Sequence, residues 1–179
     1  MHLADGIVSQ TSLVMGLNGA GALAAAWAVR SAVRGGHARV AYAGTLAAFV
    51  FAAQAVNVPL LPGASAHVIG TTLLTLTVGP ALAIAAMLSV LLVQALAFAD
   101  GGLTVLGVNL LNMAVLPALA VVGLRRLLPN SERGLKLTAI LGTLVLSLIA
   151  IYLFFTDFGS HEPHNGFLRF RFLGDIGNL

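Results

Sequence analysis

Six long apolar segments, separated by short polar or glycine-containing stretches, make up most of the chain. With boundaries defined to within a few residues, they cover residues 10–30, 40–57, 65–79, 81–99, 103–124 and 135–155. Most approach the roughly 20 residues that an α-helix needs to cross the hydrocarbon of a bilayer. Gly79-Pro80 and Asp100-Gly101-Gly102 predict sharp breaks before and after the fourth segment. The pattern therefore predicts six membrane-spanning helices.

Two of these segments have compositions that suit them to close packing. The third is short and rich in threonine, which predicts that it lies inside the helix bundle. The first contains Gly16, Gly19 and Gly21 and then the run Ala24-Ala25-Ala26. Small residues let helices approach closely, and packing within the chain is the favoured interpretation over a surface for a partner protein.

The composition supports a membrane protein. Of 179 residues, 59% are hydrophobic and 8% are charged, against roughly 25% charged in a soluble domain. We therefore predict an all-α integral membrane protein in which residues 1–179 form a single helical domain. The pI of about 10.2 comes from a few arginines without a basic face, so no nucleic acid partner is expected. The absence of cysteine excludes disulfides and thiolate metal sites.

The distribution of basic residues predicts the orientation. Seven of the nine lie around two connections between segments: Arg30, Arg34, Arg39, Arg125, Arg126, Arg133 and Lys136. The positive-inside rule places both connections in the cytoplasm. Alternation then puts the N-terminus, the 58–64 loop and Asp100 outside. It also puts residues 157–179 outside, but Arg169 and Arg171 disagree with this, and the placement of that tail stays open.

The first residues, Met1-His2-Leu3-Ala4-Asp5-Gly6, carry the strongest chemical signal. A free Met1 amine, the His2 backbone nitrogen and the His2 Nδ1 can close two fused chelate rings, giving three coplanar nitrogens. Square-planar nitrogen ligation favours Ni(II) or Cu(II). No basic stretch precedes an apolar core, so we expect no cleaved signal peptide and residues 1–9 as a retained metal-binding segment. The alternative is an accidental histidine, but Asp5-Gly6 predicts a turn that tucks this segment into the bundle.

His67 is the candidate for the fourth nitrogen. Ionisable residues at membrane depth are costly and are functional candidates, and the predicted topology puts His67 on the same side as His2. The alternative is a capping histidine near the interface. Asp5, Asn57 and Ser65 are weaker candidates for hydrogen bonds that orient the ligands. For Asn109 and Asn112, on one helix face, we favour pinning of helices, and Gln54 and Gln94 raise the same question. The His161-Glu162-Pro163-His164 stretch is interpreted as a solvated tail.

The opening motif, the stretch Ser65-Ala66-His67 with Gly70 after it, and residues 98–113 resemble the substrate-binding subunit of nickel/cobalt energy-coupling-factor transporters, the CbiM/NikM family. The resemblance covers roughly residues 1–125. It implies a metal held by the Met1 amine, the His2 amide and imidazole, and the imidazole of His67. It also implies a transmembrane coupling subunit, a cytoplasmic ATPase pair and often a small auxiliary membrane protein as partners. The chain departs from the usual motifs at Leu3-Ala4 and at Ala66, and family members generally have seven helices, whereas six segments stand out here.

These observations favour a non-catalytic capture subunit for uptake of Ni²⁺, or Co²⁺, in the inner (cell) membrane of a prokaryote. Nickel is preferred because amide deprotonation is easier with Ni(II) than with Co(II). No phosphate-cradling GxxxxGK[ST] or Gly-x-Ser-x-Gly motif is present, so ATP hydrolysis is expected in partner subunits. The alternatives are a stand-alone metal carrier or channel and, more remotely, a membrane-embedded hydrolase or a subunit that serves assembly rather than transport.

Overall fold

The computed structural model describes residues 11–56, 58–61, 64–66 and 68–144, and the structural statements below concern these residues. The elements follow one another along the chain as α1 (Thr11–Arg34), α2 (His37–Gln54), β1 (Val58–Leu61), β2 (Ala64–Ala66), α3 (Thr71–Val78), α4 (Pro80–Phe98), α5 (Leu106–Leu110), the π-helical η1 (Leu111–Val115) and α6 (Leu116–Leu127). Residues 132–144 are also helical.

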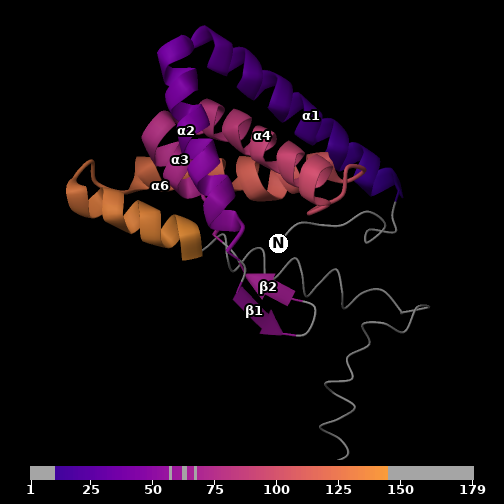
Figure 1. The fold of residues 1–179 in the computed structure, drawn as a ribbon. Coiled ribbons are helices and arrows are strands. Elements are labelled where there is room, and N and C mark those ends of the chain that lie inside the picture. The colour runs from indigo at the N-terminus through magenta and orange to yellow at the C-terminus, as the bar shows by residue number, and fades with distance from the viewer. Residues whose placement is uncertain (1–10, 57, 62–63, 67, 145–179) are drawn as a thin grey trace, which may run out of the picture. The chain divides into compact units, whose positions relative to one another are not determined.

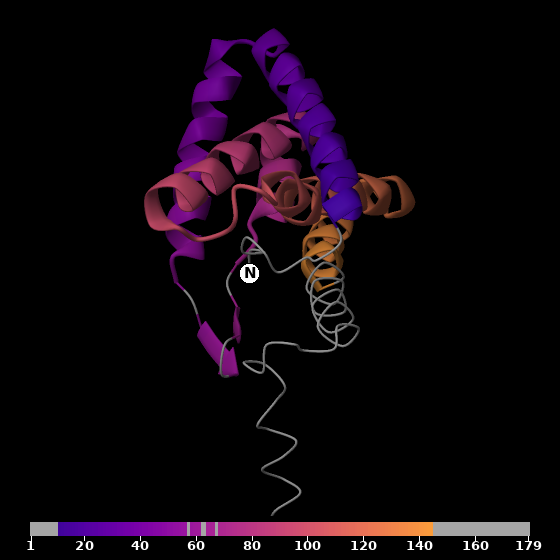
Figure 2. The same ribbon diagram turned by 90° about the vertical axis from the view of Figure 1, so that its right-hand side faces the viewer.

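Helix α4 lies at the centre of this arrangement and packs against α1, α2, α3 and α5 (Figure 1). Met87 and Leu91 from α4, Leu74 from α3 and Leu110 from α5 are at most 2% exposed. A helix that is apolar on every side suits such a position, because every face is covered by protein or lipid. Helices α1 and α2 diverge from the turn that joins them and lie on either side of α4 (Figure 2).

Three of the described helical stretches are long and apolar enough to cross a membrane: Ser12–Arg34, Pro80–Phe98 and Leu106–Leu127. On α1, large apolar side chains such as Leu23 and Trp27 are 75% and 53% exposed, as expected for a helix that faces lipid. The prediction of a helical membrane protein is therefore confirmed.

The predicted third segment, residues 65–79, is only partly helical, and this boundary was wrong. Helix α3 covers Thr71–Val78, about 12 Å of rise, which is too short to cross a bilayer. Residues 64–66 instead form β2, antiparallel to β1, with Val58 opposite Ala66 and Pro59 opposite Ser65. The sequence Pro62-Gly63 between the strands is typical of a turn, which favours a hairpin over a longer helix. The interior placement of the threonine-rich segment is confirmed, since Thr71, Thr72 and Thr75 are buried.

Both predicted breaks around α4 are confirmed. Gly79 has φ +87 and separates α3 from α4, which begins at Pro80. Pro80 suits the first turn of a helix because its missing N–H would have no intrahelical partner there. After α4, Ala99 (φ 52) and Gly101 (φ 102) take left-handed backbone conformations and end the helix.

The fifth apolar segment is one continuous helical run, α5–η1–α6, with a π-helical centre. A π-helical segment disturbs the regular backbone hydrogen bonding of an α-helix. Here the hydroxyl of Thr71, from α3, donates to the carbonyl oxygen of Met113 in this segment. The irregular turn thus gives α3 a polar attachment to the middle of an otherwise apolar helix.

Candidate metal-site framework

All three residues predicted to bind the metal, and two predicted to support them, lie outside the described residues. These are Met1, His2 and His67, together with the supporting residues Asp5 and Asn57. Ser65 lies in β2, opposite Pro59. His161 and His164 in the C-terminal tail also fall outside the description. The ligand set therefore stays a prediction, and the structure describes the framework that borders it.

Two buried amides hold the base of the β1–β2 hairpin. Gln54, the last residue of α2, donates from Nε2 to the carbonyl oxygen of Ile69 at 2.7 Å. Gln94 from α4 donates from Nε2 to Gln54 Oε1 at 2.8 Å. Gln54 is 2% exposed and Gln94 is 4% exposed. This chain of hydrogen bonds fixes the segment that follows His67 to two helices.

Gly70 sets the direction in which the chain leaves the hairpin. Its φ of +80 lies in the left-handed region, and a β-carbon there would lie 2.5 Å from Cγ1 of Val50. Only glycine satisfies both the backbone conformation and this close approach. Gly70 precedes α3 directly, so the pair Ile69-Gly70 forms a rigid anchor two to three residues after His67.

The C-terminal ends of α2 and α4 lie side by side. The rings of Phe51 and Phe98 have centroids 5.4 Å apart. The backbone N–H of Asp100 donates to the Gln94 carbonyl oxygen at 3.0 Å. The hairpin and the connection between α4 and α5 therefore leave the bundle at the same end.

Asn18, which the sequence analysis overlooked, joins this connection to α1. Its Nδ2 donates to the Thr104 carbonyl oxygen at 2.5 Å, and its Oδ1 accepts from the backbone N–H groups of Gly107 and Val108 at 2.9 and 3.3 Å. The first N–H groups of a helix have no intrahelical acceptor, and a side chain from another helix satisfies them here. An amide inside an apolar segment was the sequence signal that could have identified this residue.

Basic residues from α2 and α6 lie near the other end of α4. Arg39 from α2 donates from Nη2 to the Val78 carbonyl oxygen at 3.2 Å, at the C-terminus of α3. Arg125 and Arg126 from α6 line a cavity together with Thr75 and Pro80. Basic residues from both connections thus lie near the α3–α4 junction. The hairpin borders the opposite end of the same helix.

The two asparagines of the fifth segment have inward positions. Asn109 is 2% exposed, and Asn112 is partly buried in η1. Their predicted role in pinning helices stays a prediction.

The glutamine pair allows a first test. Replacing Gln54 with leucine leaves the buried Gln94 amide and the Ile69 carbonyl without their partner, so we expect unfolding free energy to fall by about 1–3 kcal/mol. The double variant Gln54→Leu/Gln94→Leu should lose less than the sum of the two single variants, by about 0.5–3 kcal/mol. Unfolding in mixed micelles, followed by circular dichroism, measures all four proteins. Strict additivity would contradict the proposed coupling.

The apolar helices and the polar framework at one end define a helical membrane protein. Residues 2–170 match the model of the CbiM family, described as a cobalt uptake substrate-specific transmembrane region. The chain therefore belongs to the CbiM family.

Individual relatives agree with this membership. A Haloquadratum walsbyi protein whose name describes metal transport is 41% identical over 108 residues, covering 59% of this chain and 49% of the relative. An Archaeoglobus fulgidus protein that carries the name fused nickel transport protein is 48% identical over 63 residues, covering 35% of this chain and 21% of the relative. The chain thus spans half or less of the length of these relatives.

A solved structure shows the same fold. The crystal structure of a truncated transition metal transporter aligns with a TM-score of 0.68 and 31% sequence identity. The alignment covers 84% of this chain and 69% of that one. The likeness extends over most of the helical elements described above.

Proposed function

We propose that this chain is the metal-capture subunit of an energy-coupling-factor transporter for Ni²⁺, with Co²⁺ as the second candidate. The observation that carries the proposal is the match from residue 2 to residue 170 to a family model described as the substrate-specific region for cobalt uptake. The name of the Archaeoglobus relative supports nickel. A partner must supply the energy, because the sequence contains no phosphate-cradling GxxxxGK[ST] motif.

The proposed site consists of nitrogen ligands from two distant parts of the sequence. The Met1 amine, the His2 amide nitrogen and the His2 imidazole provide three, and the His67 imidazole provides the fourth. The position of Gly70 and the Gln54–Ile69 hydrogen bond support a fixed approach for His67, since they anchor the chain just after it. Because ligands must be deprotonated, binding should weaken as pH falls.

The proposed orientation places the basic end of α4 in the cytoplasm and the hairpin end outside, in the inner membrane of a prokaryote, with six transmembrane helices in all. A transmembrane coupling subunit and an ATPase pair would then meet the chain from the membrane and the cytoplasmic side, with a small auxiliary membrane subunit as a further partner. The interiors of the three candidate spans carry no ionisable side chain, since Arg30, Arg34, Arg125 and Arg126 all lie near helix ends. A self-sufficient proton-coupled carrier would need such a relay, so the capture role is favoured.

The variant His67→Ala tests the proposal. Loss of one of four nitrogen ligands should weaken Ni²⁺ binding by more than the roughly 10–100-fold that is typical of lost supporting contacts. Titration calorimetry on the purified chain measures this affinity. His37→Ala is the matched control, because His37 is exposed at the start of α2 and should bind as the parent does. A change of less than about tenfold in His67→Ala would show that this imidazole is not a ligand.

A further inference from the structure

A cavity lies at the basic end of α4, away from the hairpin. It is open to the surface, with a volume of about 320 Å³, and is lined by α3, the start of α4, α6 and the helix of residues 132–144. This is at the lower end of the roughly 300–1,000 Å³ of small-molecule sites. Each of these elements contributes at least one residue to the lining, among them Thr75, Pro80, Arg125 and Leu135. We call this site the α3–α6 cavity.

Two polar atoms in this lining are buried and have no hydrogen-bond partner within the described part of the chain. They are Thr75 Oγ1 and Arg125 Nη1. Thr75 is 6% exposed. Arg125 uses its other terminal nitrogen, since Nη2 donates to Asn130 Oδ1 at 2.6 Å. Leaving a buried guanidinium nitrogen without an acceptor is costly. Both donors belong to residues of the cavity lining, so a ligand with oxygen acceptors would satisfy them once these side chains turn toward it.

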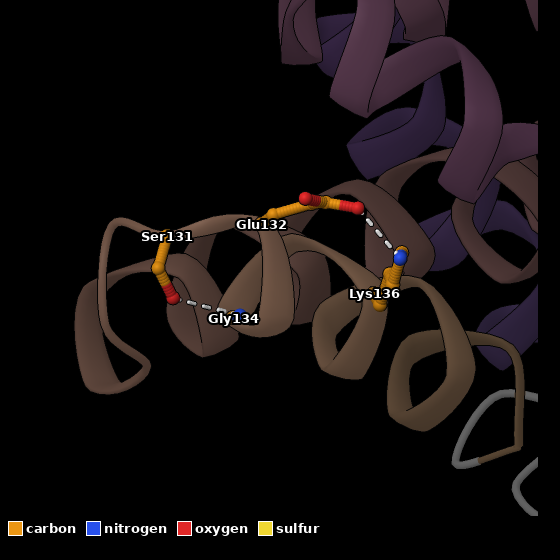
Figure 3. A network of polar contacts seen from close by, with 4 residues as sticks. All are labelled: Ser131, Glu132, Gly134 and Lys136. Atoms are coloured by element: carbon orange, nitrogen blue, oxygen red, sulfur yellow. Dashed lines mark hydrogen bonds and ion pairs between the residues drawn. The ribbon is translucent and has the colours of Figure 1, made fainter.

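Within the described helices around the cavity, no spare carboxylate is present to fill this role. No Asp or Glu occurs between Gly6 and Ala99, and Glu132 is the only one between Gly101 and Leu144. Glu132 is already engaged, because its Oε1 lies 2.6 Å from Lys136 Nζ (Figure 3). The neighbouring Ser131 hydroxyl accepts from the Gly134 N–H at 3.2 Å and caps the same helix. The charge of Arg125 and Arg126 thus stays uncompensated by the enclosing elements.

Arg39 and the start of α4 add positive potential, which the C-terminal dipole ends of α3 and α6 offset in part. Pro80 is the first residue of α4, so the positive end of that helix dipole borders the cavity. Arg39 bonds to Val78 at the adjoining end of α3. The rest of the lining is largely apolar, including Leu76 and Val122. Anionic oxygens and an apolar part are therefore both accommodated.

We propose that the α3–α6 cavity binds the phosphate headgroup of an anionic phospholipid, drawn from the leaflet on the side of the basic connections. Arginine suits phosphate because its planar group donates two parallel hydrogen bonds. Basic pockets between transmembrane helices recognise such headgroups. Free phosphate shares this chemistry, but the apolar lining and the position between apolar helices favour the lipid. The site is independent of the metal ligands proposed above.

The test uses the full chain in nanodiscs and measures retained lipid by native mass spectrometry. Phosphatidylglycerol should be retained over phosphatidylcholine, and Arg125→Gln should reduce that preference by about tenfold or more, the scale of a charged hydrogen bond. Arg34→Gln is the matched control, since it removes the same charge from an exposed position on α1. Its preference should stay within about twofold of the parent value.

Thr75→Val provides a second variant that keeps the side-chain shape and the charge of the cavity. It should weaken phosphatidylglycerol retention by about fivefold, as expected for one hydrogen bond. Equal losses in Arg125→Gln and Arg34→Gln would overturn the proposal, because they would indicate general charge attraction. So would unchanged retention in Thr75→Val. A third outcome would also overturn the proposal, namely binding of inorganic phosphate to the chain in phosphatidylcholine discs that is lost in Arg125→Gln. The ligand would then be a soluble anion and not a lipid.

Discussion

Adding two glycines before Met1 should abolish high-affinity nickel binding. The proposed site uses the Met1 amine as a ligand, and the extension converts that amine into an amide and moves the histidine to the fourth position. The fused rings that join the terminal amine to the imidazole can then no longer form. A single added residue would not test this, because a histidine in third position chelates nickel by itself. We expect affinity to fall by at least about a hundredfold, beyond the effect of losing one supporting contact. Titration calorimetry with Ni²⁺ on the purified chain measures the loss.

The control for this experiment is an extension of the same size after Leu179, which leaves the amine free. It should bind nickel as the parent chain does. Both proteins should show the same helical content and the same melting temperature, because neither extension changes a residue of the described helices. Binding by the N-terminally extended chain within about threefold of the parent would contradict a chelating terminus, since a lost ligand costs more than that.

Replacing Gly107 with alanine should disrupt the contact between α1 and α5. A β-carbon at this position would lie 2.6 Å from the Asn18 Cα and 2.8 Å from its Oδ1. The two helices would have to separate, which also breaks the bonds from Asn18 to the start of α5. Overpacking and lost hydrogen bonds together should lower the unfolding free energy by about 2–4 kcal/mol. Reversible unfolding in mixed micelles gives this value.

Gly44→Ala is the matched control, because Gly44 lies within α2 and a β-carbon there meets nothing within 4 Å. Alanine is the better helix former, so this variant should be as stable as the parent or about 0.5–1 kcal/mol more stable. Gly21→Ala should resemble Gly107→Ala, since its β-carbon would lie 2.6 Å from the Gly107 Cα. If Gly107→Ala behaved like Gly44→Ala, the close crossing of α1 and α5 would be refuted.

The glycines of the first segment show where sequence reasoning stopped. Composition indicated that small residues there allow close helix packing, and Gly21 does meet Gly107. A β-carbon added at Gly16 or Gly19 would meet nothing within 4 Å. The sequence pattern treats all three alike, because the residue that Gly21 meets lies in a distant segment of the chain. Which glycine makes the contact depends on how the helices cross.

In the candidate site, too, the sequence alone predicts one part and the tertiary structure is needed for the other. The order of amine, backbone nitrogen and imidazole in Met1-His2 follows from covalent structure, so the sequence alone predicts that chelate. The anchors of the hairpin do not follow from local pattern. Gln54 and Gln94 are 40 residues apart, and their hydrogen bond exists only because α2 and α4 end side by side.

The sequence by itself determined the membrane class, the breaks at Gly79-Pro80 and after Phe98, and the chemistry of the opening residues, because hydropathy, backbone constraints and ligand type are local properties. Only the tertiary structure decided three other features. Residues 64–66 form a strand and not the start of a helix, Asn18 accepts hydrogen bonds from the first N–H groups of α5, and Arg125 lines a cavity together with Thr75. These features depend on contacts between segments far apart in the chain. Buried polar groups need hydrogen-bond partners, and here packing supplies those partners from other segments.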